Sequence, residues 1–149
     1  MELKNFDDFT YIFLINASQM AYIEDAKKTH IFLQRFNEFY RYMIREDKGS
    51  MLSGELKALQ NYIDIQTTIH QGRFNITYEN LLDNNDVYIK HLSLLEFLNS
   101  VLSNALNMYE GYFTIHIEIR NNKHMYATIV LEVDSKKEIF NIILTEEVK

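Results

Sequence analysis

The stretch LNSVLSNALNMYEGYFTIHIEIR, residues 98–120, changes its hydrophobic period part-way along. Apolar residues in 98–109 recur at three- and four-residue spacing, which is typical of one face of a helix. In 113–119 every second residue is apolar, which is typical of a half-buried strand. Gly111 lies between the two patterns, so we expect it to end the helix as a C-terminal glycine.

Strand patterns dominate the rest of the C-terminal half. HMYATIVLEV (124–133) and EIFNIILTE (138–146) follow the first strand, and Asn121-Asn122 is expected to form a hairpin turn. FNITY (74–78) alternates in the same way before the helix. Ser93 and Glu96 have the spacing of a capping box, which predicts that this helix begins at Ser93.

Residues 1–70 show helical patterns instead. We expect one helix up to about Glu24, a second with Asp25 as its N-cap, and a third capped by Ser53. The predicted fold is therefore α+β: an N-terminal helical hairpin, then a small mixed or antiparallel sheet with helices packed on one face. The predicted domains are a dimerisation arm, 1–48, and an α/β sandwich, 49–149.

The first two helices carry more apolar surface than one neighbouring helix can cover. Either this surface packs against the C-terminal half, or two hairpins pair into a four-helix bundle; we favour the bundle, hence a homodimer. The expected interface residues lie on the apolar faces of these two helices: Phe6, Phe9, Phe13, Met20, Phe32, Phe36, Phe39 and Met43.

The composition of the 149 residues excludes several classes of function. The formal net charge is −6 and no basic cluster occurs, which argues against binding to nucleic acid or to an anionic membrane surface. No cysteine is present, so disulfide and thiolate chemistry are excluded. No apolar run reaches the length of a membrane helix, and we expect a cytoplasmic protein.

Four segments resemble, in order and spacing, the cytoplasmic core of LytS-type sensor histidine kinases. FLIN (13–16) is similar to the end of that family's phosphoacceptor motif, Pro-His-Phe-Leu-Phe-Asn. FNEFYRYMI (36–44) resembles the end of its second dimerisation helix, and LSGELKALQNYIDIQTTIHQGRFNITYE (52–79) resembles the segment that follows. LNSVLSNAL (98–106) resembles its ATP-binding helix, which carries Glu-Asn-Ala. The resemblance implies a dimerisation hairpin followed by an ATPase-like domain.

The residues that the family's chemistry requires are replaced. Ile12 stands at the phosphoacceptor position and has no nucleophilic atom, and Ser103 stands at the position of the catalytic glutamate and has no carboxylate to act as a base. Asn104 remains but has no carboxylate partner for magnesium, and Asp134 stands where the adenine-binding aspartate would. No glycine follows Gly111, so a phosphate-binding loop is not expected. We therefore expect no catalysis, cofactor or metal, and the histidines show no metal-ligand spacing.

The resemblance leaves three hypotheses. The first is a non-catalytic protein acting by contact in a two-component pathway, as a mixed dimer with a kinase or a decoy for a response regulator, because both dock on the helical bundle in active relatives. Its expected contacts are Lys27, Lys28, Arg35 and Glu38. The second is a phosphotransferase that relays phosphate through His30, and the third is a repurposed small-ligand-binding module.

Overall fold

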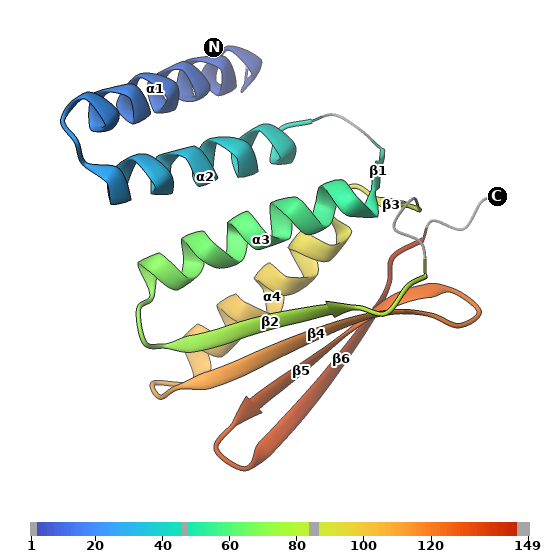
Figure 1. Cartoon of the computed structure of the whole chain (residues 1–149). Helices are drawn as coiled ribbons and strands as arrows, with labels where there is room; N and C mark the ends of the chain where they lie inside the picture. Colours follow the sequence, from blue (N-terminus) through green and yellow to red (C-terminus); the bar gives the residue numbers. More distant parts are fainter. Residues whose placement is uncertain (1–2, 46–47, 84–86, 146–149) are drawn as a thin grey trace.

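The computed structural model describes residues 3–45, 48–83 and 87–145, and for residues 3–9 the backbone only. The described elements follow one another along the chain (Figure 1) as α1 (Leu3–Ile23), α2 (Lys27–Met43), β1 (Gly49–Met51), α3 (Leu52–Ile69), β2 (Phe74–Asn80), β3 (Tyr88–Lys90), α4 (Ser93–Met108), β4 (Phe113–Asn121), β5 (Met125–Val133) and β6 (Lys136–Ile143). This order confirms the predicted α+β class and the helical hairpin at the N-terminus.

Four strands form the main sheet, in the order β2-β4-β5-β6. β2 runs parallel to β4, with Phe74 opposite Phe113, whereas β4, β5 and β6 form an antiparallel meander. β1 and β3 form a separate two-stranded antiparallel sheet. These two strands were not predicted, because three residues are too few to show a hydrophobic period.

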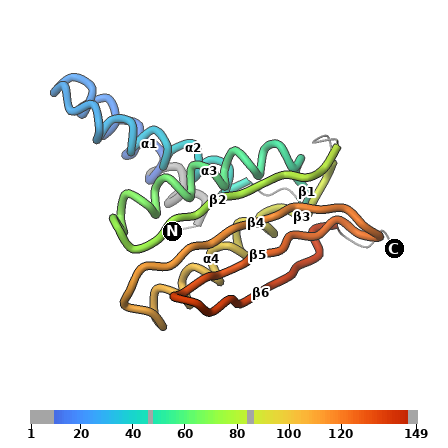
Figure 2. Tube along the Cα trace, turned by 60° about the horizontal axis from the view of Figure 1, so that its bottom comes forward, coloured from blue at the N-terminus to red at the C-terminus, as the bar shows by residue number. Residues whose placement is uncertain are grey.

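Three layers stack in order: the α1–α2 hairpin, then α3 and α4, then the sheet (Figure 1). α3 and α4 cover one face of the sheet, where alternate residues of β2, β4 and β5, such as Ile76, Ile117 and Ile129, are buried. None of the described helices covers the other face (Figure 1). Seen from another side, the tip of the hairpin extends beyond the α/β layers (Figure 2).

The turn between α1 and α2 corrects the predicted role of Asp25. The N–H of Ala26 donates to the carbonyl of Ala21 (2.9 Å) and the N–H of Asp25 to that of Tyr22 (3.1 Å), which is the Schellman pattern. Asp25 has φ 57° and ends α1 in the left-handed conformation. It is not the N-cap of α2; Ala26 holds that position without a side-chain cap.

The predicted start of α3 is also wrong in detail, whereas the predicted start of α4 is confirmed and only its capping box is wrong. α3 begins at Leu52, one residue before Ser53, because the N–H of Leu52 donates to the Val87 carbonyl (2.8 Å) beside the small sheet. α4 begins at Ser93, but Ser93 is its first helical residue and its hydroxyl donates to the Lys90 carbonyl (2.7 Å), so no capping box forms.

The end of α4 differs from the prediction as well. The helix ends at Met108 and Tyr109 is extended, with φ −119°, so the chain leaves directly toward β4. Gly111 has no positive φ and is not the stop residue. Instead, the guanidinium of Arg73 donates to the Tyr109 carbonyl at 2.5 Å and satisfies the helix end. The turn expected at Asn121-Asn122 is confirmed in place, although it extends over 122–124.

Candidate functional site

The positions compared with the kinase motifs all lie on the surface. Ile12 is on α1 and is 57% exposed. Ser103 and Asn104 are exposed on α4. Asp134 is exposed in the turn between β5 and β6.

The β5–β6 connection is a two-residue turn. Val133 pairs with Lys136, which leaves Asp134 and Ser135 as the whole connection, and Asp134 has φ 56°. This end of the sheet lies next to the end of α4, because the Tyr109 hydroxyl donates to Oε1 of Glu138 at 3.1 Å. Asp134 therefore serves a tight hairpin turn, and the connection holds no further residues to form a loop over a phosphate.

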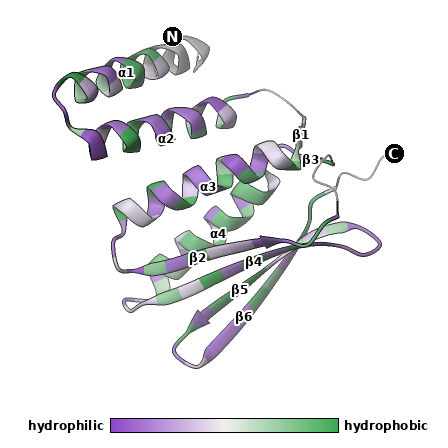
Figure 3. Ribbon diagram, in the orientation of Figure 1, coloured by the Kyte–Doolittle hydropathy of each residue, from purple (hydrophilic) through white to green (hydrophobic). Residues whose placement is uncertain are grey.

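An open apolar groove runs along the α1–α2 hairpin. Phe13 is 62% exposed and Met20 is 60% exposed, and the two lie on the same face of α1, two turns apart. With Leu33 of α2 they border a hollow of about 530 Å³. Figure 3 shows the contrast: hydrophobic residues occur along α1 although it is the outermost helix. The remaining lining residues are Asn16, Ala17, Ala21, Glu24, Ala26 and Thr29. We call this feature the hairpin groove.

The other predicted interface residues divide between two surfaces. Phe39 contacts α3, where its ring lies 5.6 Å from that of Tyr62, and Met43 borders a cavity beside the same tyrosine. Phe32 and Phe36 are half-buried, and Phe36 stacks on Tyr40 within α2. The side chains of Phe6 and Phe9 lie outside the described residues. Packing against the C-terminal half thus accounts for the end of α2, whereas the face around Phe13 and Met20 is open among the described residues.

Two of the four predicted contact residues already have partners inside the chain. Arg35 lies 3.6 Å from a carboxylate oxygen of Asp64 on α3. Glu38 accepts a hydrogen bond from the Asn61 amide at 3.2 Å. The other two, Lys27 and Lys28, are exposed in the first turn of α2.

His30 is part of the hairpin's internal packing. Its Nδ1 lies 2.9 Å from the Ser18 carbonyl oxygen and 3.0 Å from the Ser18 hydroxyl. Its ring also lies 5.4 Å from that of Tyr22. Since a carbonyl only accepts, the bond to Ser18 requires a proton on Nδ1, and in the neutral tautomer the lone pair is then on Nε2. The contacts join α1 to α2.

A buried polar cluster joins the hairpin to the layers below. Glu55 of α3 is fully buried, and burial raises the pKa of its carboxyl group to about 7. The backbone N–H groups of Leu92 and Leu94, at the start of α4, lie near this carboxyl group and lower its pKa by part of the amount that burial raises it. Neither carboxyl oxygen of Glu55 has a hydrogen-bond partner of ideal geometry among the described residues. Glu55 therefore stands near the N-terminus of α4, where a capping group was expected from Ser93.

Tyr42 and His91 complete this junction cluster. The two rings lie 4.8 Å apart, and Nδ1 of His91 lies 2.6 Å from the Ser50 hydroxyl. Burial raises the pKa of Tyr42 to about 12, and the carboxyl group of Glu55 adds to the shift. The cluster thus joins the end of α2, strand β1, helix α3 and the segment before α4. Sequence reasoning missed it because its members are far apart in the chain.

One group on the sheet could hold a metal ion. His116, which showed no metal-like spacing in sequence, lies beside Glu79 and Glu118 on the open face.

The N-terminal half of the chain is similar to a known protein family. Residues 7–74 match the family model described as histidine kinase. The match covers most of α1, all of α2 and α3, and the first residue of β2, so this part of the chain is histidine-kinase-like. No curated protein matches the chain. Among the described helices, none is both long and apolar enough to cross a membrane.

Proposed function

We propose that this chain is a non-catalytic, histidine-kinase-like signalling protein that acts by pairing its α1–α2 hairpin with a second hairpin. The hairpin groove carries this proposal. Exposed Phe13 and Met20 border an apolar hollow on the outermost layer, which is the surface that a four-helix bundle would bury. The similarity to histidine kinases includes residues 7–43 of this hairpin.

The chemistry of the compared positions supports the lack of catalysis. Ile12 has the exposure that a phosphoacceptor needs, but its side chain has no nucleophilic atom. Ser103 carries no carboxylate to act as a base. The two-residue turn at Asp134 provides no backbone loop to surround a phosphate.

Pairing with an active kinase would give this protein a regulatory effect. In a mixed dimer whose phosphate transfer runs between protomers, the kinase's ATP site would face Ile12, and the kinase's histidine would face a protomer without ATP. Neither transfer could proceed, so the mixed dimer would be silent. The same hairpin surface could instead bind a response regulator and keep it from its kinase.

The test uses the purified full chain with γ-labelled ATP and magnesium. We expect no label on the wild-type protein and none on Ile12→His, because restoring the acceptor does not restore the ATP site. We also expect the chain to bind at least one purified kinase core or response regulator of its host, and Met20→Asp to abolish that binding. Label on the wild-type protein would refute the absence of catalysis, and binding to none of these partners would refute the signalling role.

A phosphate relay through His30 is the second candidate. The observation that favours it is the contact between Nδ1 of His30 and the Ser18 carbonyl, which in the neutral tautomer makes Nε2 a possible nucleophile. Incubation with a phosphorylated response regulator of the host should label the wild-type chain and not His30→Gln if this role is real. No transfer to the wild-type chain would exclude it.

A further inference from the structure

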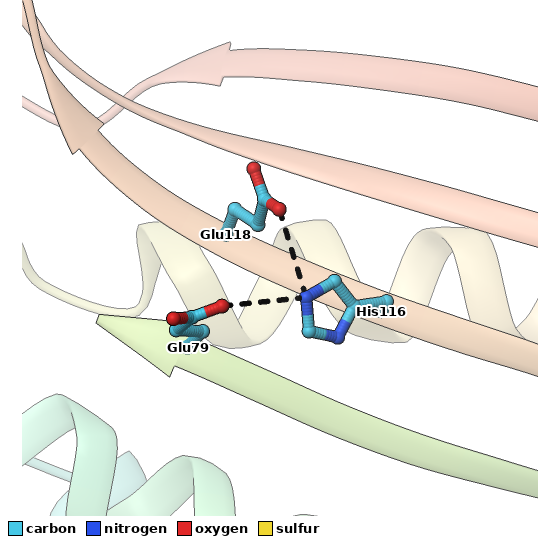
Figure 4. A group of neighbouring side chains, drawn as sticks. All are labelled: Glu79, His116 and Glu118. Atoms are coloured by element: carbon cyan, nitrogen blue, oxygen red, sulfur yellow. Dashed lines mark ion pairs between the residues drawn. The ribbon is translucent and has the colours of Figure 1, made fainter. Parts of the chain in front are cut away.

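Four polar side chains gather on the open face of the sheet, where β2 and β4 run side by side. Thr77 and Glu79 come from β2, and His116 and Glu118 from β4. The parallel register places Thr77 opposite His116 and Glu79 opposite Glu118. Because side chains alternate across a strand, all four project to the face that the helices leave uncovered. Figure 4 shows both carboxylates turned toward the imidazole ring.

The geometry points to a binding site for a zinc-like divalent cation formed by Glu79, His116 and Glu118, and we propose this site as a feature separate from the hairpin. Nε2 of His116 lies 4.0 Å from Oε2 of Glu79 and 3.8 Å from Oε1 of Glu118. All three ligand atoms lie within 4.8 Å of one another. Ligands held about 2.0–2.2 Å from one zinc ion lie roughly 3–3.5 Å apart, so small rotations of the glutamate side chains bring the set together.

A hydrogen bond already orients the imidazole for this role. The Thr77 hydroxyl lies 2.7 Å from Nδ1 of His116. When Nδ1 carries the proton and donates to this hydroxyl, the lone pair of Nε2 points toward the two carboxylates. Metal-bound histidines are typically held by such a bond at the second nitrogen. Thr77 therefore acts as a positioning residue for the site.

The charges around the site favour a cation. Arg120 binds Oε2 of Glu118 through Nη2 at 2.6 Å and Nε at 2.9 Å, which leaves Oε1 directed at His116. The two carboxylates and this one guanidinium leave a net charge of −1 when the imidazole is neutral. On β5 the residues opposite His116 and Glu118 are Val130 and Thr128, which add no charge. Zinc supplies the missing positive charge and accepts both oxygen and nitrogen ligands.

Titration calorimetry of the full chain with zinc chloride, after treatment with a chelator, tests the site. We expect one ion per chain and at least a tenfold loss of affinity in His116→Ala and in Glu79→Gln, because each removes one ligand. Thr77→Val should weaken zinc binding by about tenfold, because it removes the hydroxyl that orients a ligand. Thr77→Ser keeps a hydroxyl at this position and should bind zinc as wild type does. His124→Ala, which removes an exposed histidine from the next turn, is the matched control and should bind as wild type.

A further readout separates this site from weak surface binding. Cobalt bound in place of zinc should give visible absorption that His116→Ala loses and His124→Ala keeps. Absence of saturable binding, or equal binding by His116→Ala with a native circular dichroism spectrum, would overturn the proposal.

Discussion

Glu55 is a carboxyl group held in the core, and its environment makes stability depend on pH. Its pKa is about 7 in the folded chain and 4.5 without the fold. Between these values the folded state keeps a proton that the unfolded state has lost. The stabilising contribution is therefore complete below about pH 4.5 and is lost as the pH rises through about 7.

Glu55→Gln should remove this dependence. We expect the variant to match wild type at about pH 5 and to exceed its free energy of unfolding by on the order of 2–3 kcal/mol at about pH 8, because each unit of pKa shift is worth about 1.4 kcal/mol. Urea denaturation at the two pH values measures the difference. Glu110→Gln, at an exposed position, should follow wild type throughout. Parallel pH profiles for wild type and Glu55→Gln would contradict the role assigned to burial.

The turn between α1 and α2 can be tested at the scale of one element. Asp25 adopts φ 57°, a conformation that costs an L-residue energy and that glycine adopts freely. Asp25→Gly should therefore stabilise the hairpin by about 0.5–1 kcal/mol in thermal denaturation followed at 222 nm. Glu24→Gly, one residue earlier, should destabilise it. If Asp25 were the N-cap of α2, its replacement by glycine would instead cost a few tenths of a kcal/mol.

Element types were more predictable than element ends. The alternation of Phe113, Ile115 and Ile117 predicted β4 because one face of the strand meets the helices and the other meets solvent. The ends of α3 and α4 were missed because contacts from elsewhere fix them: Val87 holds the start of α3, and Arg73 satisfies the end of α4. Local capping patterns cannot report such partners.

The candidate sites show the same limit. The groove residues Phe13 and Met20 were predicted because they share a helical face, but sequence could not show that Phe39 turns toward Tyr62 instead. The proposed metal site needs the parallel register of β2 and β4. Its only local signal is the pair His116 and Glu118, two residues apart on one strand, and Glu79 joins them through pairing across the sheet.

The whole molecule combines a well-filled α/β body with an incompletely covered arm. Leu59, Leu98 and Ile117 in the body are fully buried, whereas large apolar side chains on α1 remain more than half exposed. A monomer in water rarely leaves such a patch uncovered. A second hairpin placed on the groove would bury it, so the arm of one chain is expected to be completed by another.

Analytical ultracentrifugation at micromolar concentration measures this pairing directly. The wild-type chain should sediment as a dimer and Phe13→Asp as a monomer, because a carboxylate at a buried apolar contact costs several kcal/mol. Phe13 is largely exposed within one chain, so the change should leave the monomer folded. Gln19→Asp, an exposed polar position on the same helix, should remain dimeric. A folded wild-type monomer at this concentration, or a Phe13→Asp variant that still dimerises, would contradict pairing through the hairpin groove.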